Sequence, residues 1–421
     1  MISYDEAIGI VQEQAAKCRL AVEDIPLSGV SGRLCAEDIK APSSNQPFDN
    51  SAMDGFALHA EDLEYAVNDN PVALEMAAHI AAGDGRAFGA LARGQCYEIM
   101  TGAPLPPGCD AVVPVEKTSR DGARVIFRET VKKNENIRRA GEDFKVGDTV
   151  LDRGRVLDAG HILALATLGI GRARVFKRPS VALISTGREV VDDLSASLAP
   201  GQIYNSTKPY LEAALVEAGV ELHSYGTVMD DPADFKKKIQ CMIDNKIDIG
   251  VSTGAVSAGV HDFVPSVLKE MGAEILFHKV SIRPGKPLLF AQLPGGALFF
   301  GLPGNPVASA AGLRFFVQPA LRAMHGLPPE EVQYAFLAEP YKKKHPLRHF
   351  ARARVSFGKD FALHVNIPQR QQSFMVRQFT NSNAWAVIPE EAECLAVGEK
   401  IQVFSDNFCA FCPGINDNPV C

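Results

Sequence analysis

Residues 180–189 read SVALISTGRE, a short apolar run that passes directly into a loop of small and hydroxylated residues. A run of this length bounded by turn residues is typical of a strand buried in a sheet. The same arrangement recurs downstream, in IDIGVSTGAVSAG (247–259) and in ALFFGLPGNP (297–306). The three stretches therefore predict three buried strands, each ending in a small-residue loop.

Helical patterns alternate with these strands. We expect helices over 208–218 and 263–271, ended by Gly219 and Gly272, and a long helix over 306–322. Asp231 and Pro232 read as the N-cap and first residue of a further helix, and ELHSYGTV (221–228) as a further strand. Such alternation predicts a doubly wound α/β domain over 174–325, with a parallel sheet, helices on both faces and ligands beyond the carboxyl ends of the strands.

The small residues at the three strand ends predict a site for a phosphate-bearing or oxyanion ligand. Glycines and hydroxyls let backbone N–H groups approach an anion closely, and KVSIRPGKP (279–287) adds Lys279, Arg283 and Lys286. Ordinary turn chemistry is the alternative. No P-loop or dinucleotide-binding glycine pattern occurs at these edges. The predicted ligand-binding residues are Ser252, Thr253, Gly254, Ser257, Lys286, Pro303, Gly304, Asn305 and Pro306.

Acidic residues occur near the same strand ends. They are Glu189, Asp230, Asp231 and Asp262. Taken one at a time, these residues are better explained as caps, Asp231 of its own helix and Asp262 of the helix that follows. Beside a polyanion they suit Mg²⁺, which takes a few carboxylates and shares its remaining ligands with phosphate and water. The acidic residues therefore predict a Mg²⁺ site at this edge of the sheet.

The rest of the chain divides into smaller regions. A helical pattern up to residue 43 gives way to short strands such as CYEIM, AVVPV and RVIF, and helix returns at 155–170. We expect a split first domain (1–43 and 139–173), an inserted mostly β domain (44–138), the α/β domain (174–325), a small C-terminal β barrel (326–408) and a tail (409–421).

Overall composition excludes several classes of protein. The net charge of −7 argues against nucleic-acid binding, and no apolar stretch approaches the roughly 20 residues that span a bilayer. The N-terminus has acidic residues and a Ser3/Glu6 capping box where a signal peptide would have basic residues. We therefore expect a cytoplasmic protein. The tail carries Cys409, Cys412 and Cys421, and because no second CxxC or nearby histidine accompanies them, a frayed terminus is favoured over a metal site.

Eight motifs in order resemble those of the molybdopterin molybdenumtransferases, which are related to the C-terminal part of gephyrin. They are FDNSAMDGFAL (48–58), IMTGAPLPPGCDAVV (99–113), NIRRAGED (136–143), STGREV (185–190), GQIYNST (201–207), GAVSAGVHDF (254–263), IRPGKPLLF (282–290) and GLPGNPVAS (301–309). Membership of this family would mean that the α/β domain is similar in fold to the molybdopterin adenylyltransferases. It also implies a homodimer in which Mg²⁺-dependent cleavage of adenylylated molybdopterin releases AMP and molybdate is inserted.

The resemblance also implies roles for individual residues. Glu189 and Asp262 would hold Mg²⁺ or orient water, with Asp230 as a third acidic match. Lys279, Arg283 and Lys286 would bind phosphate or molybdate, and Pro303 and Pro306 would shape the last loop. The implied catalytic set is Asp54, Thr101, Asp143, Asp230, Lys279 and Arg283, of which Asp54, Thr101 and Asp143 would come from the partner subunit.

This chain departs from the family pattern at two of these positions. Ala255 stands where a second glycine is usual, and Arg283 stands where lysine is common. Two other functions are compatible with the α/β domain: adenylylation of molybdopterin, and a gephyrin-like scaffold. The N-terminal motifs argue against the first, and the retained charged positions argue against the second. Apo-molybdoenzymes and a molybdopterin adenylyltransferase are the expected protein partners.

Overall fold

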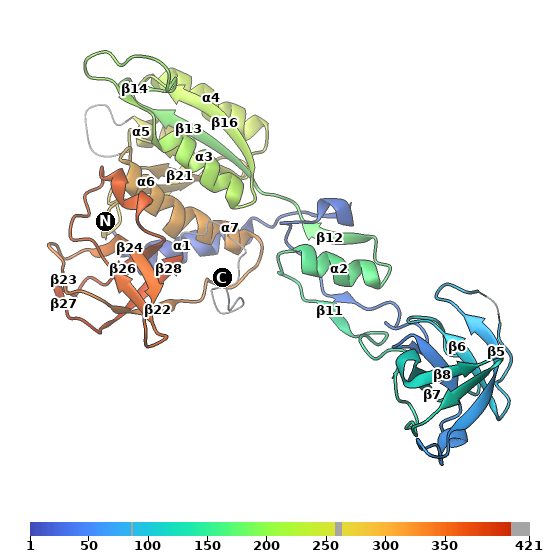
Figure 1. Ribbon diagram of the computed structural model, residues 1–421. Coiled ribbons are helices and arrows are strands. Elements are labelled where there is room, and N and C mark those ends of the chain that lie inside the picture. Colours follow the sequence, from blue (N-terminus) through green and yellow to red (C-terminus); the bar gives the residue numbers. More distant parts are fainter. Residues whose placement is uncertain (86, 257–262, 406–421) are drawn as a thin grey trace. The chain divides into compact units, whose positions relative to one another are not determined.

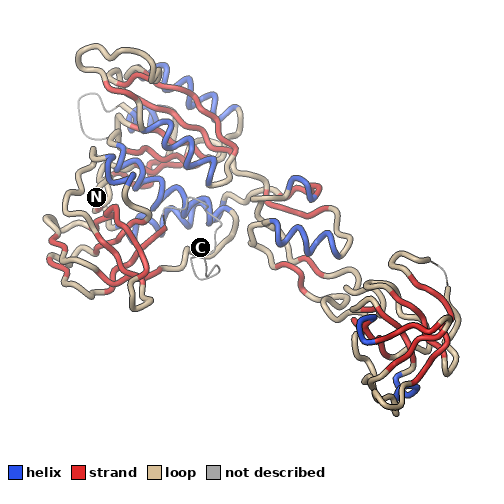
Figure 2. The backbone as a smooth tube through the Cα atoms, in the orientation of Figure 1, coloured by secondary structure: helices blue, strands red, loops and turns tan. Residues whose placement is uncertain are grey.

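The computed structural model describes residues 1–85, 87–256 and 263–405. The chain forms two compact units, and each is described by itself. The first unit contains Met1–Ala36, Gly154–Leu157 and the chain from Arg174 onward, and the second contains Glu37–Arg153 and Asp158–Ala173. Figure 1 labels their helices and strands, and Figure 2 separates helix, strand and loop by colour.

A six-stranded sheet forms the centre of the first unit. Its strands, in spatial order, are β16 (Glu221–Val228), β13 (Ser180–Thr186), β17 (Ile249–Thr253), β21 (Leu298–Leu302), β20 (Leu289–Gln292) and β18 (Glu274–His278). The four strands predicted from the sequence, β13, β16, β17 and β21, are mutually parallel. Strand β20 runs antiparallel to both of its neighbours, so two unpredicted strands extend one edge of the predicted parallel sheet.

Helices cover both faces of this sheet, which confirms the doubly wound fold. They are α3 (Thr207–Glu217), α4 (Pro232–Asp244), α5 (Val264–Glu270), α6 (Pro306–Gly312) and α7 (Gln318–Met324). Along β13, Val181 and Leu183 pack into one buried cluster, whereas Ala182 and Ile184 pack into another. The alternation buries both faces of the strand. Asp231 caps α4 as predicted, because its carboxylate accepts a 2.9 Å hydrogen bond from the Ala233 N–H.

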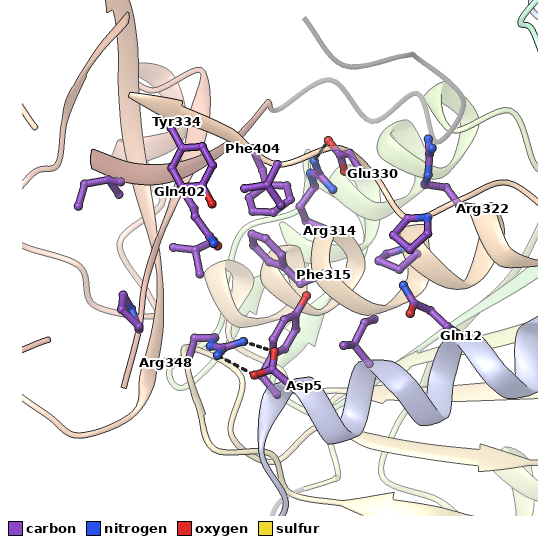
Figure 3. A pocket seen from close by; sticks show the side chains of 18 of the residues that line it. Asp5, Gln12, Arg314, Phe315, Arg322, Glu330, Tyr334, Arg348, Gln402 and Phe404 are labelled. Carbon is purple, nitrogen blue, oxygen red and sulfur yellow. Dashed lines mark hydrogen bonds and ion pairs between the residues drawn. The ribbon is translucent and has the colours of Figure 1, made fainter. Parts of the chain in front are cut away.

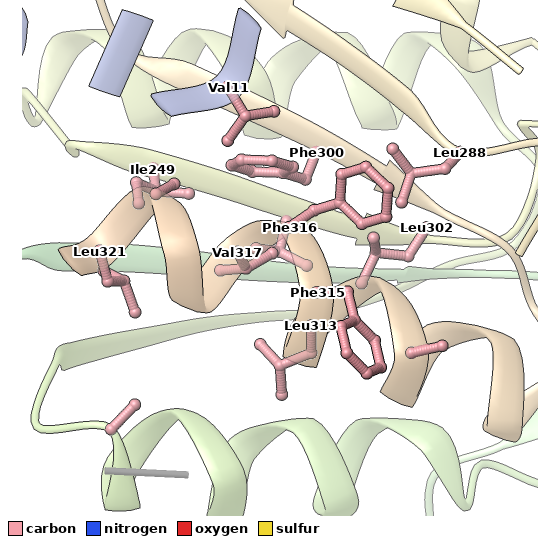
Figure 4. Packing of buried hydrophobic residues seen from close by; sticks show 14 of the residues in the cluster. Val11, Ile249, Leu288, Phe300, Leu302, Leu313, Phe315, Phe316, Val317 and Leu321 are labelled. Carbon is pink, nitrogen blue, oxygen red and sulfur yellow. The ribbon is translucent and has the colours of Figure 1, made fainter. Parts of the chain in front are cut away.

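The predicted helix over 306–322 is continuous but not uniform. Helix α6 passes into a π-helical turn, Leu313–Val317, before α7 begins. This turn places Phe315 and Phe316 in the larger of the two buried clusters, which also contains Phe300 and Leu302 from β21 (Figure 4). Phe315 also stacks on Phe350 of the C-terminal barrel at a ring-centroid distance of 3.9 Å.

Helix α1 (Tyr4–Lys17) belongs to this first unit. Ser3 accepts a 3.1 Å hydrogen bond from the Glu6 N–H at its start. Its buried residues Ala7, Val11 and Ala15 pack into the same cluster as Leu321 of α7. The segment 1–43, expected to share one domain with 139–173, therefore divides between the two units. The four-domain boundaries stay a prediction.

A small closed barrel forms the C-terminal part of the first unit, as predicted. Its strands are β24 (Arg348–Phe357), β25 (Leu363–Asn366), β22 (Gln333–Leu337), β28 (Lys400–Ser405) and β26 (Ala384–Ile388), and β26 pairs back onto β24. The short strand β19 (Ile282–Arg283) is added to β24 from the α/β region. Its core is a separate cluster of small apolar side chains that includes Ala351, Ala353 and Val365.

The second unit is built on a six-stranded β sheet. Its strands, in spatial order, are β7 (Ala111–Pro114), β4 (Gly55–Leu58), β6 (Gln95–Ile99), β5 (Val72–Ile80), β9 (Arg124–Phe127) and β8 (Thr118–Asp121). The predicted strands within CYEIM, AVVPV and RVIF are β6, β7 and β9. Helix α2 (Ala159–Thr167) begins at a capping box formed by Asp158 and His161.

Short elements complete the chain. The strands are β1 (Val22–Pro26), β2 (Ile39–Lys40), β3 (Asn50–Ser51), β10 (Ile137–Arg138), β11 (Thr149–Leu151), β12 (Arg172–Phe176), β14 (Val190–Val191), β15 (Ile203–Tyr204), β23 (Tyr341–Lys342) and β27 (Cys394–Leu395). Single 3₁₀ turns occupy Leu27–Gly29, Ala60–Leu63, Val115–Lys117 and Val376–Thr380. Among the helices of the described chain, none has the length and apolar character needed to cross a bilayer.

Candidate active site

A cavity of about 940 Å³ lies at the carboxyl ends of β13, β17 and β21 in the first unit. This is the edge at which a doubly wound fold binds ligands. The loops that follow these strands all contribute to its wall, as predicted. The predicted site residues that line it are Glu189, Asp230, Thr253, Gly254, Gly304, Asn305 and Pro306.

Gly254 holds the three strand ends together. Its backbone φ is +85°, and a Cβ atom there would lie 2.6 Å from Thr186 Oγ1. Thr186 donates a 2.9 Å hydrogen bond to the Thr253 carbonyl, and the Gly254 N–H donates a 2.9 Å bond to the Leu302 carbonyl. Only glycine fits this conformation and this close approach without strain. The loop after β17 is thus tied to both neighbouring strands.

Ala255 follows in the left-handed conformation, with a φ of +52°. This is the position at which the sequence departs from the usual glycine. For a residue with a Cβ atom the left-handed region costs roughly 1–2 kcal/mol. The structure therefore explains why glycine suits the position, and it shows that the loop keeps the conformation that glycine favours.

The neighbouring aspartates have separate roles. Asp231 is the helix cap, whereas Asp230 is not. Asp230 has a φ of +53°, and its carboxylate accepts a 3.3 Å hydrogen bond from the Arg188 N–H and lies 3.6 Å from the Arg188 guanidinium. It lines the cavity, so of these two neighbouring residues only Asp231 is a helix cap.

Glu189 folds back over Gly187. A Cβ atom on Gly187, whose φ is +132°, would lie 2.7 Å from one carboxylate oxygen of Glu189 and 2.9 Å from the other. The absence of a side chain at Gly187 thus leaves space that the carboxylate occupies. Glu189 is exposed and lines the cavity, so its oxygens are available to a ligand.

The sequence analysis missed a polar network at the edge of the cavity. The buried Asn205 donates a 2.9 Å hydrogen bond to Asp192, which also accepts from Thr227 at 2.9 Å and pairs with Lys208 at 3.2 Å. Burial raises the Asp192 pKa, but the hydrogen bonds from Asn205, Thr227 and Lys208 outweigh it and lower the pKa overall. The motif GQIYNST could have indicated this network, because it places the polar side chain of Asn205 just before helix α3.

Other predicted residues do not line this cavity. Ser252 is fully buried, and within the described chain its hydroxyl has no hydrogen-bond partner. Pro303 is buried and its carbonyl accepts a hydrogen bond from the Ser309 hydroxyl. Lys279, Arg283 and Lys286 are likewise absent from the cavity wall. Ser257, Asp262 and the tail with Cys409, Cys412 and Cys421 lie outside the described residues.

In the second unit, Asp54 and Thr101 are in direct contact although they come from different motifs. Asp54 Oδ1 accepts hydrogen bonds from the Thr101 N–H and hydroxyl, each 2.6 Å long. These two bonds lower the pKa of the exposed Asp54 carboxyl. The third predicted residue of this unit, Asp143, accepts a 2.8 Å bond from the Asn45 side chain.

The surrounding FDNSAMDGFAL stretch is held by its own polar groups. Asp49 accepts a 2.8 Å hydrogen bond from the Ala140 N–H and pairs with Arg139. That backbone bond is the largest cause of the lowered Asp49 pKa. Gly55 begins β4, where a Cβ atom would lie 2.0 Å from the Val113 carbonyl oxygen. Asp49 thus holds the shape of the loop, and Gly55 allows two strands to meet.

A second cavity of about 850 Å³ lies between α1, the α7 region and the barrel (Figure 3). None of the predicted site residues lines it. Its charged groups are matched within the protein: Arg348 pairs with Asp5, and the buried Arg314 donates a 2.7 Å bond to Glu330 and a 3.1 Å bond to the Ser405 carbonyl. These contacts stabilise the packing of the barrel on the helices.

The metal prediction rests on few carboxylates. Within residues 1–85, 87–256 and 263–405, no group of three or more His, Cys, Asp or Glu side chains is arranged to hold a metal ion by itself. Glu189 and Asp230 supply the carboxylates on the cavity wall. A hard cation there would take further oxygens from its ligand or from water, as Mg²⁺ commonly does.

Comparison with known proteins agrees with this architecture. Three family models match consecutive regions: the MoeA N-terminal region (domain I and II) at residues 2–169, a probable molybdopterin binding domain at 182–323, and the MoeA C-terminal region (domain IV) at 334–405. Two crystal structures of the molybdopterin biosynthesis MoeA protein from Pyrococcus horikoshii match with TM-scores of 0.80 and 0.78 at 29% and 26% identity. Each covers 96% of this chain and 99% of the other.

The sequences of related proteins match this chain over nearly its whole length. A molybdopterin molybdenumtransferase from Synechococcus elongatus is 37% identical over 410 residues, which cover 96% of this chain and 100% of the relative. One from Staphylococcus aureus is 37% identical over 359 residues, 84% of each chain. The resemblance read from the eight sequence motifs is confirmed. The chain belongs to the molybdopterin molybdenumtransferase family, the transferases of molybdenum cofactor biosynthesis.

Proposed function

We propose that the cavity at the strand ends binds adenylylated molybdopterin and that the protein inserts molybdate into it, with release of AMP, in a Mg²⁺-dependent reaction. The observation that carries this proposal is the convergence of three small-residue loops and two carboxylates, Glu189 and Asp230, on one cavity of about 940 Å³. That volume suits a nucleotide-sized ligand rather than a small oxyanion alone.

Glu189 and Asp262 are the proposed Mg²⁺ ligands. The space above Gly187 lets the Glu189 carboxylate lie against the backbone, facing a cavity wall rich in hydroxyl and amide groups. The chemistry of these donors fits a hard cation that completes its shell with phosphate oxygens. When bound, the ion would neutralise charge on the phosphates as their bond breaks.

Lys279, Arg283 and Lys286 are the proposed anion-binding residues. Arg283 and Lys286 are exposed, and within the described residues no carboxylate pairs with either of them. Arg283 is in register with His349 across β19 and β24. Burial lowers the His349 pKa to about 3, with His345, Arg283 and Lys343 adding to the effect. The exposed Arg283 guanidinium, which no carboxylate of the described chain pairs with, is a cation that a phosphate or molybdate oxygen can contact.

We further propose a homodimer in which Asp54, Thr101 and Asp143 act on the ligand held by the first unit of the partner subunit. The support is that Asp54 and Thr101 are exposed and joined to each other, although they come from separate motifs. An exposed pair bonded in this way is ready to contact a group from outside its own unit.

The reaction is tested by incubating the pure protein with adenylylated molybdopterin, molybdate and Mg²⁺ and measuring AMP together with reconstitution of an apo-molybdoenzyme. For Glu189→Gln we expect the Mg²⁺ concentration at half-maximal rate to rise roughly tenfold or more, since a charged ligand is replaced by a neutral one. Glu217→Gln, at an exposed position of α3, is the matched control and should change nothing. No AMP under any metal condition would refute the proposed reaction.

A further inference from the structure

A segment of the barrel region reaches the cavity described above. Phe374 and Val376 both line it, together with the strand-end residues, although they lie beyond all three strand-end loops in the chain and belong to the barrel region. Phe374 is 65% exposed and Val376 is 50% exposed. A large apolar side chain exposed by itself is common on protein surfaces. One that faces a ligand-sized polar cavity requires an explanation.

Hydrogen bonds hold the segment that immediately precedes Phe374. The Ser373 carbonyl accepts a 3.2 Å bond from the Val307 N–H in α6. The Gln371 side chain both accepts a 3.1 Å bond from the Arg352 N–H and donates a 2.9 Å bond to the Arg352 carbonyl. The segment is therefore tied to the helix that follows the third strand-end loop and to the barrel, and the position of Phe374 is fixed relative to the cavity.

The two phenylalanines of this segment have different surroundings. The Phe379 ring packs against Tyr210 at 5.4 Å and Trp385 at 6.1 Å, so it anchors the segment in the protein. No aromatic ring of the described chain lies against Phe374. Its ring, which is 65% exposed and has no aromatic neighbour in the described chain, is therefore available to a ligand in the cavity.

The rest of the cavity wall divides into two kinds of surface. The strand ends present small and polar residues, among them Ser185, Gly304 and Asn305, which suit phosphate oxygens. Ile203 and Tyr204 of β15, which are 55% and 40% exposed, add apolar and aromatic surface as Phe374 does. A ligand that satisfies both surfaces has an anionic part and a flat apolar part.

We propose that Phe374 is a specificity-determining residue that stacks its ring against a planar fused heterocycle of the ligand. The inference rests on the proposed function, since adenylylated molybdopterin carries two such rings, the adenine and the pterin, on either side of its phosphates. Stacking on an aromatic side chain stabilises a bound base and tolerates differences between bases, because every base has a π face.

Binding measured by fluorescence separates the two rings. One arm titrates the protein with ethenoadenosine monophosphate, and the other with a fluorescent 6-hydroxymethylpterin monophosphate. For Phe374→Ala we expect the Kd of one probe to rise roughly tenfold to a hundredfold, the effect of removing one stacking partner. The arm that responds identifies the ring. Phe374→Trp should bind within about threefold of the wild type, whereas Phe374→Leu should resemble Phe374→Ala, because apolar volume alone does not stack.

The matched control is Phe357→Ala, which removes a phenylalanine that is 72% exposed on β24 and does not line the cavity. It should leave both Kd values unchanged. Equal binding of both probes by Phe374→Ala and the wild type, or no probe binding by the wild type, would overturn the stacking proposal.

The AMP-release assay reports separately on the proposed function. If stacking is correct and the reaction is as proposed, Phe374→Ala raises the KM for adenylylated molybdopterin by a similar factor while kcat changes little. AMP release with an unaltered KM would refute stacking and leave the function intact. Probe binding that depends on Phe374, in a protein that releases no AMP, would support stacking and refute the function.

Discussion

Asp54 and Thr101 form one polar unit, in which a single carboxylate oxygen accepts both the backbone N–H and the hydroxyl of the threonine at 2.6 Å. Forty-six residues and the whole of β5 lie between them in the chain. Two charge-assisted bonds to one oxygen favour the ionised form of the carboxyl and orient its other oxygen.

Removing the hydroxyl should raise the Asp54 pKa. In Thr101→Val the larger of the two causes of the lowered pKa is lost and the backbone bond remains, so the pKa should move toward that of a free aspartate. Because the folded pKa is depressed, ionisation of Asp54 favours the folded protein above the unfolded pKa, and this effect is lost as the pH falls through the folded value. Carbon-13 NMR titration of the aspartate side chains measures the change. Thr101→Ser is the control, and equal pKa values in Thr101→Val and the wild type would contradict the assignment.

The proposed dimer predicts complementation between subunits. At a Mg²⁺ concentration that saturates the wild type but not Glu189→Gln, Asp54→Asn and Glu189→Gln should each release little AMP as homodimers. A refolded equimolar mixture should recover about a quarter of the wild-type rate, since half of the dimers are mixed and each of these has one site free of both changes. Asp54→Asn mixed with Thr101→Val is the control, because both changes affect the same half of every site. A mixture no more active than its components would argue that each site is built within one subunit.

Ala255→Gly should stabilise the protein. The φ of +52° is strained for alanine and ordinary for glycine, so relief of strain should exceed the entropic cost of glycine and add about 1 kcal/mol. The unfolding temperature should rise by roughly 2 °C. Ala213→Gly, on the exposed side of helix α3, is the matched control. It should lower the free energy of unfolding by about 1 kcal/mol, because glycine is unfavourable inside a helix. A lower unfolding temperature for Ala255→Gly would mean that the Cβ packing outweighs the strain.

The buried His325 should make stability fall in mild acid. Burial lowers its pKa to about 4; the hydrogen bond with the Leu321 carbonyl opposes this, and the charge of Arg322 adds to it. The unfolded imidazole titrates near pH 6.5, so protons bind the unfolded chain first as the pH falls. The contribution of the neutral imidazole to the free energy of unfolding is therefore complete above about pH 6.5. Between that pH and about pH 4 the free energy of unfolding falls by about 1.4 kcal/mol per pH unit. Denaturant unfolding at several pH values should show a shallower slope for His325→Gln. Parallel profiles for the two proteins would count against this account.

Local patterns in the sequence predicted most of the regular structure. The apolar run Val181–Ile184 is a strand, Asp231 caps its helix, and the helices at 208–218 and 263–271 stop beside Gly219 and Gly272. These features depend on residues within a few positions of one another, so they can be predicted from the sequence alone. The gathering of the strand-end loops followed, because parallel strands in a doubly wound sheet end at one edge.

Contacts between distant segments were decided by the tertiary structure. The sequence shows neither that β20 and β18 extend the parallel sheet nor that α1 packs on α7. Asn205 and Asp192 acquire their role only when β14 and β15 pair side by side.

Tertiary contacts also decided the roles of two further residues, Phe374 in the cavity wall and Gly55 in the second unit. Phe374 reaches it because the barrel segment is bonded to helix α6, and Gly55 must lack a side chain because the Val113 carbonyl of another strand lies against it. The sequence by itself determined most of the elements of the α/β domain, the edge of the sheet at which the strand-end loops gather, and the family, since each is encoded in short runs. The tertiary fold decides which side chains from distant segments complete the site. Those contacts depend on the path of the loops, which local sequence patterns do not encode.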